Sequence, residues 1–216
     1  MKPSLALYSF FNSSAAYRVR IGLHYKKLTF DYKAVHLTKD GGEQYKSELL
    51  AVNPMGEVPT LVHNGKVLSQ SMAILLYLDE QFPDPTLFTQ DSFQKAQIVQ
   101  FCEAINSGIH PIQNLKVRVE LEKRYQVSVE ERERWCAYWI ERGFHSIEKM
   151  LQSTAGAYCF DDQITAADLF LIPQVYNARR YKMDLTAYPT IVRIEEHCLK
   201  QEAFKLAHPS AQPDFS

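Results

Sequence analysis

The sequence predicts an α/β domain followed by an all-helical domain. The hydrophobic pattern changes near Phe82: short strand-like and helix-like segments alternate before it, and almost only helical periodicity follows. Between the two patterns, residues 83–90 (PDPTLFTQ) contain two prolines and several turn-forming residues. We therefore expect one domain at 1–82, a linker at 83–90 and a helical domain at 91–216.

The first domain is expected to run β-α-β, then β-β-α. Asn64-Gly65 joins two short apolar runs and is a strong hairpin signal. A βαβ unit followed by an antiparallel hairpin and a helix is typical of a thioredoxin-like domain. The expected strands lie at 5–9 and 28–37 and in the hairpin at 58–69; the expected helices are 14–25 and 71–82.

The second domain carries helix-start signals. Ser128 and Glu131 have the spacing of a capping box, and so do Thr165 and Asp168. Ile164 and Leu169 flank the latter pair at the positions of a hydrophobic staple. The expected helices are 93–109, ended or kinked by Pro111, then 128–152, 164–181 and a single last helix at 188–207.

Composition excludes several classes of protein. A net charge of −1 argues against a nucleic-acid binder, and no apolar run is long enough to span a membrane. The N-terminus lacks the cleavage site of a signal peptide. The four cysteines are scattered without a close pair, which favours free thiols in a reducing compartment over disulfides or a zinc site. We expect a soluble, cytoplasmic protein without a metal.

The turn between the first strand and the first helix carries two hydroxyls, Ser13 and Ser14, with no acid or cysteine beside them. A hydroxyl and a helix N-terminus together stabilise a thiolate enough to lower a thiol pKa from about 8.5 to about 6.5–7.5. The thiol would have to come from a ligand. The alternative is that a serine only caps the helix, while Arg18 and Arg20 lie in solvent.

Two further features point to the same ligand. Pro59 follows Val58 at the start of a strand, where thioredoxin-like folds hold a cis proline; the alternative is an ordinary trans proline. Gln70 and Ser71 open a helix directly after a strand, where N–H groups and a hydroxyl could bind an amino-acid carboxylate; the alternative is a plain N-cap. A thiolate site, a backbone strip and a carboxylate site together describe a binding site for glutathione.

Five motifs resemble those of the zeta-class glutathione transferases: SSAAYRVRIGL, NPMGEVPTL, QSMAILLYL, GIHPIQNL and TAADLFLIPQV. The resemblance extends from Leu5 to about Pro213 and implies the glutathione transferase fold, with glutathione as cofactor and a homodimer as the assembly. It implies Ser13, Ser14 and Arg18 as catalytic residues. The residues that it implies for the glutathione site are Ser13, Ser14, Ala15, Ala16, Tyr17, Arg18, Gln44, Val58, Pro59, Gln70, Ser71, His110 and Asn114.

The sequence departs from the family pattern at two places. Ala15 stands where the family usually has a cysteine, so a mixed disulfide with glutathione at this position is not expected. His110 stands where the family usually has glutamine. The histidine either lines the site or is a packed side chain.

The resemblance implies a glutathione-dependent isomerase that converts maleylacetoacetate to fumarylacetoacetate by reversible addition of the thiolate to the cis double bond. Arg18 and Arg180 are expected to hold the carboxylates of this small dicarboxylate; Arg180 is alternatively a solvated or helix-end charge. Other reactions on this scaffold are maleylpyruvate isomerisation and dehalogenation of small acids. A general conjugating transferase or peroxidase, or a non-catalytic binding protein, are the remaining alternatives.

Overall fold

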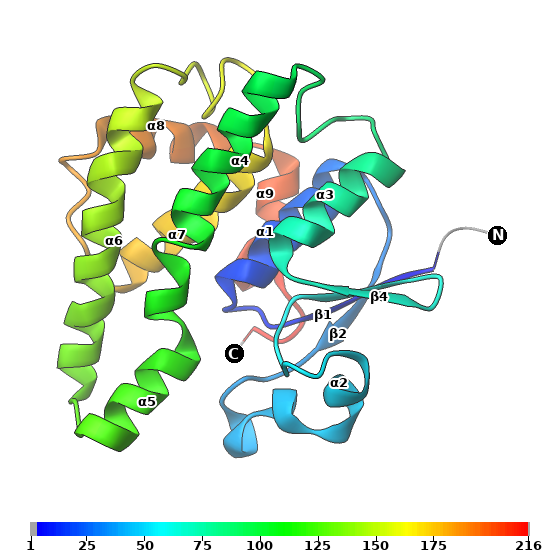
Figure 1. Ribbon diagram of the computed structural model, residues 1–216, viewed down its shortest axis with the longest axis vertical. Coiled ribbons are helices and arrows are strands. Elements are labelled where there is room, and N and C mark those ends of the chain that lie inside the picture. Colours follow the sequence, from blue (N-terminus) through cyan, green and yellow to red (C-terminus); the bar gives the residue numbers. More distant parts are fainter. Residues whose placement is uncertain (1–3, 216) are drawn as a thin grey trace. The chain divides into compact units, whose positions relative to one another are not determined.

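The computed structural model describes residues 4–215, except for the side chains of Asp40 and Ser47. The chain forms two compact units, one of Met1–Leu87 with Leu199–Ser216 and one of Phe88–Cys198 (Figure 1). This grouping assigns the C-terminal segment to the first unit, whereas the sequence analysis assigned it to the helical domain. The domain boundaries expected from the sequence stay a prediction.

A four-stranded sheet with the order β2-β1-β3-β4 forms the centre of the first unit, as the thioredoxin-like prediction requires. β1 is parallel to β2, whereas β3 is antiparallel to both β1 and β4. Helices α1 and α3 pack against each other and lie side by side in Figure 1. The elements are β1 (Leu5–Ser9), α1 (Ser14–Tyr25), β2 (Asp31–Ala34), α2 (Ser47–Val52), β3 (Thr60–His63), β4 (Lys66–Ser69) and α3 (Ser71–Gln81).

The strand directions bring distant segments to one end of the sheet. Tyr8 near the end of β1 pairs with Thr60 at the start of β3, and Thr60 pairs with Ser69 at the end of β4. Ser9 pairs with Ala34 at the end of β2. The turns that leave β1, β2 and β4, and the turn that enters β3, therefore share this end.

Apolar side chains from the sheet and both helices form the core of this unit. The buried cluster comprises Leu5, Leu7, Val19, Leu23, Leu61, Ile74 and Leu78. The predicted hairpin is confirmed, because β3 and β4 are joined by Asn64 and Gly65 with φ of 50° and 78°. Two positive φ values in succession are the requirement of a type I′ turn, which Asn-Gly meets at low cost.

The second unit is helical. Both predicted capping boxes are confirmed: the Ser128 Oγ accepts from the Glu131 N–H at 3.2 Å, and the Asp168 carboxylate accepts from the Thr165 N–H at 2.8 Å. Asp168 is fully buried, and burial raises its pKa.

The helices of the second unit are α4 (Ser92–Asn106), α5 (Leu115–Tyr125), α6 (Val129–Leu151), α7 (Ala166–Arg180) and α8 (Pro189–Cys198). Within residues 4–215, no helix is long and apolar enough to cross a membrane.

The single last helix expected at 188–207 is wrong. The chain leaves α8 at Cys198 and begins a new helix, α9 (Glu202–Ala207), after an extended Gln201. The break coincides with the passage from the second unit to the first, where α9 packs against α1. A continuous amphipathic pattern does not reveal such a break, because both helices bury an apolar face. The sequence analysis also did not identify α2 and α5.

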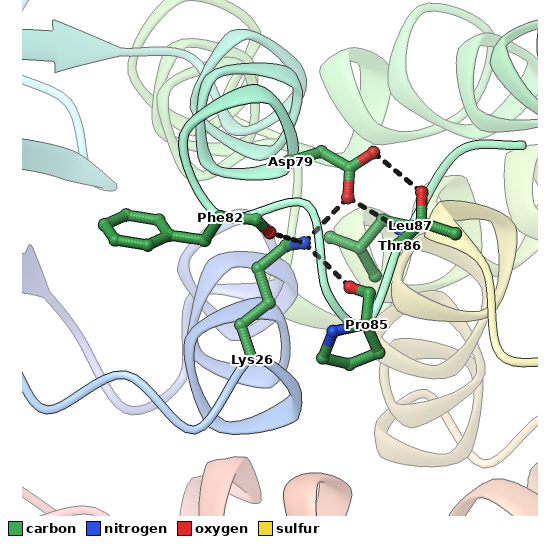
Figure 2. A network of polar contacts seen from close by, with 6 residues as sticks. All are labelled: Lys26, Asp79, Phe82, Pro85, Thr86 and Leu87. Atoms are coloured by element: carbon green, nitrogen blue, oxygen red, sulfur yellow. Dashed lines mark hydrogen bonds and ion pairs between the residues drawn. The ribbon is translucent and has the colours of Figure 1, made fainter. Parts of the chain in front are cut away.

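The segment after α3 is tied to α1 by a buried lysine (Figure 2). The Lys26 ammonium has no exposed surface and donates to the Asp79 carboxylate at 2.7 Å, to the Phe82 carbonyl at 2.6 Å and to the Pro85 carbonyl at 2.8 Å. Asp79 also accepts from the Leu87 N–H at 2.7 Å. The first part of the segment expected to be a linker is therefore fixed within the first unit.

We predict that Lys26→Met destabilises the protein by about 3–5 kcal/mol, because it removes the cation paired with the mostly buried Asp79 carboxylate and the ammonium donor to two carbonyls. Denaturant unfolding measures the loss. The neighbouring Lys27→Met is the matched control, since Lys27 is exposed. Equal unfolding midpoints for the two variants would contradict this role.

Candidate active site

Ser13 is the N-cap of α1, and its Oγ accepts from the Ala16 N–H at 3.2 Å. Ser13 therefore does cap the helix, as the alternative interpretation holds. Capping does not exclude a chemical role for its hydroxyl. A hydroxyl has one proton to donate and two acceptor positions. Capping occupies an acceptor position only, so the half-buried Ser13 hydroxyl keeps its proton for a ligand at the helix N-terminus.

Arg20 fixes the turn that carries Ser13. Its fully buried guanidinium donates to the Ser9 hydroxyl and to the Phe10 and Phe11 carbonyls, each at 3.0 Å. The Ser13 N–H also donates to the Phe10 carbonyl at 3.0 Å. The alternative that the arginines of this segment lie in solvent is wrong, because Arg18 is fully buried as well.

Arg18 lies behind Ser71. Its Nη1 donates to the Ser71 Oγ at 3.1 Å, and its side chain has no exposed surface. Such a side chain offers a substrate no contact in this conformation, which differs from the expectation that Arg18 binds a substrate carboxylate. The arginine instead fills an acceptor position of the Ser71 hydroxyl, whose proton remains available for a ligand.

Ser71 is the first residue of α3, and the preceding Gln70 provides no side-chain cap. The first turn of α3 therefore combines uncapped N–H groups, the partial positive charge of a helix N-terminus and a buried arginine. Gln70 is exposed and has φ of 72°, a conformation that few residues other than glycine adopt. Its Nε2 donates to the Glu57 carboxylate at 3.4 Å.

The turn that enters β3 is held by its own polar groups. The Val58–Pro59 peptide bond is cis, as expected. The Asn53 Nδ2 donates to the Glu57 carbonyl at 2.9 Å and to the Thr60 Oγ1 at 3.0 Å. Both Asn53 and Thr60 are buried, so the backbone of Val58 is presented from a fixed loop.

Gln44 follows β2 at the same end of the sheet. Its Nε2 donates to the Leu37 carbonyl at 3.2 Å, whereas its buried Oε1 has no partner among the described residues. Gly42 has φ of 103°, and a Cβ there would lie 2.5 Å from the Gln44 side chain. An unpartnered amide oxygen suits a ligand that brings N–H groups, as the peptide glutathione does.

The remaining predicted residues of the serine turn differ in exposure. Ser14 is mostly buried and Ala15 is half-buried. Ala16 is fully buried, although its N–H supports Ser13. Tyr17 is 1% exposed, with its ring against His208 and the Arg20 guanidinium. Ala16 and Tyr17 pack within the first unit in this structure, and the part expected of them in the glutathione site stays a prediction.

The other predicted residues belong to the second unit. Asn114 is the N-cap of α5 and accepts from the Lys116 N–H at 3.1 Å, while His110 is half-buried in a short 3-10 turn. Arg180 is exposed at the end of α7 and lies 5.8 Å from the centre of the Tyr181 ring. Their contacts with glutathione or substrate stay predictions.

The sequence analysis did not identify Arg118 of α5 as a neighbour of Arg180. Both arginines lie close enough to Tyr181 and to Cys136 of α6 to favour the charged forms of these two groups. Burial raises the pKa of Tyr181 to about 12. The sequence pattern around Arg118 does not indicate that this arginine lies near the groups that Arg180 also affects, since a charged side chain in an amphipathic helix usually marks a solvated face.

All four cysteines are free, buried and located in the second unit. Burial raises the pKa of Cys136, Cys159 and Cys198, which keeps these thiols protonated. No cysteine lies in the first unit, so a thiolate beside Ser13 has to be supplied by a ligand. The donors and the amide oxygen at this end of the sheet fit glutathione.

Comparison with known proteins identifies the family of this chain. The family model described as "Glutathione S-transferase, N-terminal domain" matches residues 3–80. The chain is 45% identical to the maleylacetoacetate isomerase of Rattus norvegicus over 96% of this chain and 94% of that protein. It is 41% identical to a zeta-class glutathione S-transferase of Euphorbia esula over 99% of this chain and 93% of that protein.

Two solved structures are similar over nearly the whole chain. One is a holo maleyl pyruvate isomerase, described as a bacterial zeta-class glutathione S-transferase, with a TM-score of 0.94 and 38% identity over 98% of this chain and 100% of that one. The other is the maleylacetoacetate isomerase of Anaeromyxobacter dehalogenans with bound GSH, with a TM-score of 0.89 and 39% identity over 100% of this chain and 99% of that one. The chain belongs to the zeta class of the glutathione S-transferase family.

Proposed function

We propose that this protein is a glutathione-dependent cis–trans isomerase that converts maleylacetoacetate to fumarylacetoacetate. One observation carries the proposal: Ser13 and Ser71, at one end of the sheet, each accept a hydrogen bond from the protein and keep a hydroxyl proton for a ligand. These two hydroxyl donors suit two anionic groups of glutathione, the thiolate and the γ-glutamyl carboxylate. The names of the relatives support the substrate class.

Bound glutathione supplies a thiolate that adds reversibly to a conjugated cis double bond. The chain's own contribution is to keep that sulfur ionised and in place. The Ser13 hydroxyl donates a hydrogen bond to the sulfur, and the N-terminus of α1 adds a favourable partial charge. Ser14 and Ala15 line the same turn without a competing acid or thiol.

The rest of glutathione is assigned to the neighbouring turns. Ser71 and the first turn of α3 bind the γ-glutamyl carboxylate, and Arg18 positions Ser71 from behind. The backbone of Val58, next to Pro59, pairs with the cysteinyl unit. Gln44 accepts an N–H of the ligand, and Gln70 contacts the γ-glutamyl end from its exposed position.

Arg180 is proposed to hold a substrate carboxylate. The two adjacent arginines at the end of α7 differ in their partners: Arg179 binds Glu195 through its Nε at 2.8 and 3.0 Å, whereas Arg180 has no carboxylate partner among residues 4–215. The neighbouring Arg118 adds a second cation. Two cations suit a small dicarboxylate better than a large apolar electrophile.

Maleylpyruvate is the second candidate substrate, because a holo maleyl pyruvate isomerase is similar to this chain with a TM-score of 0.94. An ultraviolet assay of maleylacetoacetate and maleylpyruvate, each with and without glutathione, separates the two. We expect glutathione-dependent isomerisation that is faster with maleylacetoacetate. A preference for 1-chloro-2,4-dinitrobenzene over every small acid would instead identify a general transferase.

We predict that Ser13→Ala raises the pKa of the bound glutathione thiol by about one pH unit or more, because one charge-assisted hydrogen bond is lost. Titration of the ultraviolet absorbance of the thiolate measures this pKa. Ser128→Ala is a matched control, since it removes the serine cap of α6 in the other unit. An unchanged thiol pKa in Ser13→Ala would transfer the role to Ser14 or to backbone N–H groups.

We predict that Arg180→Met lowers kcat/KM for maleylacetoacetate by more than about tenfold, because a substrate carboxylate loses its bidentate partner. The affinity for glutathione should stay nearly unchanged, as measured by a binding titration. Arg134→Met serves as the control, because it removes an exposed arginine that makes only surface ion pairs. Equal efficiency of Arg180→Met and the parent would restore the solvated-charge interpretation of Arg180.

We further propose a homodimer, as is usual for this fold, located in the cytoplasm. Four free cysteines support a reducing compartment. A stable dimer typically buries more than about 1,200 Å². Light scattering is expected to give about twice the chain mass of 24.9 kDa at micromolar concentration, and the mass of a single chain would contradict the dimer.

A further inference from the structure

The C-terminal segment contacts the turn that carries Ser13. Asp214 Oδ2 accepts from the Phe11 N–H at 3.0 Å, and Asp214 Oδ1 accepts from the Tyr32 hydroxyl at 2.7 Å. The Phe215 ring lies edge-on to the Phe11 ring, with 5.4 Å between their centres. These contacts join the end of the chain to a peptide only two residues before Ser13.

Both polar groups of Phe11 are held by side chains from elsewhere in the chain. Its N–H donates to Asp214, and its carbonyl accepts from Arg20 at 3.0 Å. Phe11 is largely buried, so water does not readily replace either partner. The backbone of Phe11, two residues before Ser13, is therefore held by one anion and one cation, each from a different segment.

The Asp214 carboxylate is itself held in place. Tyr32 lies on β2, where it pairs with Leu7 of β1, and burial followed by the Asp214 hydrogen bond raises the pKa of its phenol. The phenol therefore remains a donor to Asp214 at physiological pH. Arg20 also binds the Ala207 carbonyl at the end of α9 at 3.1 Å, which fixes the part of the C-terminal segment that leads to Asp214.

We propose that Asp214 is a positioning residue for Ser13: by holding the Phe11 N–H, it fixes the direction in which the Ser13 hydroxyl donates to the ligand sulfur. The inference rests on the proposed role of Ser13 in glutathione binding. Asp214 touches neither glutathione nor substrate in this role. Its loss leaves a buried N–H without an acceptor, and the turn then relaxes away from the geometry that favours the thiolate.

The test measures the pKa of the glutathione thiol in complexes of the full-length variants, together with kcat, KM and thermal unfolding. Asp214→Ala is expected to raise the thiol pKa enough to lower the thiolate fraction at neutral pH about threefold to tenfold. Glutathione affinity should change much less, since the Ser71 end is intact. Asp214→Asn should behave like the parent, because its amide oxygen can accept from Phe11 and its NH₂ can donate to the Tyr32 oxygen.

Glu202→Gln is the matched control, because it converts another acid of the C-terminal segment to an amide at an exposed position. A parent-like thiol pKa in folded Asp214→Ala overturns the inference, and so does equal damage in Asp214→Asn and Asp214→Ala. If Asp214→Ala does not fold, Tyr32→Phe decides: a smaller rise in thiol pKa supports the inference, and no rise overturns it.

Ser13→Ala separates this inference from the proposed function. A raised thiol pKa in Ser13→Ala with a parent-like value in folded Asp214→Ala overturns the positioning role alone. A parent-like value in Ser13→Ala overturns the role proposed for Ser13, and the positioning role with it.

Discussion

The buried guanidinium of Arg20 organises the first unit through hydrogen bonds to backbone carbonyls and a serine hydroxyl. Arg20 is fully buried, and it donates to three carbonyls and one serine hydroxyl. Burying a charge costs several kcal/mol unless hydrogen bonds replace its hydration. The carbonyls that supply them belong to the turn after β1 and to the end of α9, so satisfying this one charge fixes both segments. The position of Ser13 follows from that requirement.

The two arginines of the serine turn act in different directions. Residues two apart on a helix do not face each other. Arg20 therefore binds the turn after β1, while Arg18 reaches the start of α3. Each arginine supports one serine: Arg20 through the backbone before Ser13, and Arg18 through the hydroxyl of Ser71. In both cases a hydrogen bond from the protein occupies an acceptor position of the serine hydroxyl. The hydroxyl proton remains available as a donor, and such a donor suits an anionic ligand.

Local signals in the sequence were sufficient for much of the fold. Asn64-Gly65 specifies a hairpin because both residues tolerate positive φ, and the capping boxes of α6 and α7 satisfy N–H groups within a few residues. The helix start at Ser14 was predictable for the same reason, because Ser13 caps α1. The turns to which we assign glutathione were predictable in outline, since each of them follows or precedes a recognisable strand.

Long-range contacts were not predictable from local pattern. A helical segment with two arginines normally has a solvated face, and only the tertiary structure shows that Arg18 and Arg20 are buried. The contact between Phe11 and Asp214 joins residues 203 positions apart. The break between α8 and α9 depends on which unit each helix packs in, and periodicity carries no information on that choice.

The central claim is that one end of the sheet binds glutathione through the hydroxyl protons of Ser13 and Ser71. Each of these hydroxyls also accepts a hydrogen bond from the protein. A crystal structure of the glutathione complex tests it most directly. The account predicts the sulfur within hydrogen-bond distance of the Ser13 Oγ and a γ-glutamyl carboxylate oxygen on the Ser71 Oγ, with the Ala16–Ser13 and Arg18–Ser71 hydrogen bonds retained. A sulfur bound away from Ser13, or a carboxylate bound directly by Arg18 with Ser71 displaced, would contradict it.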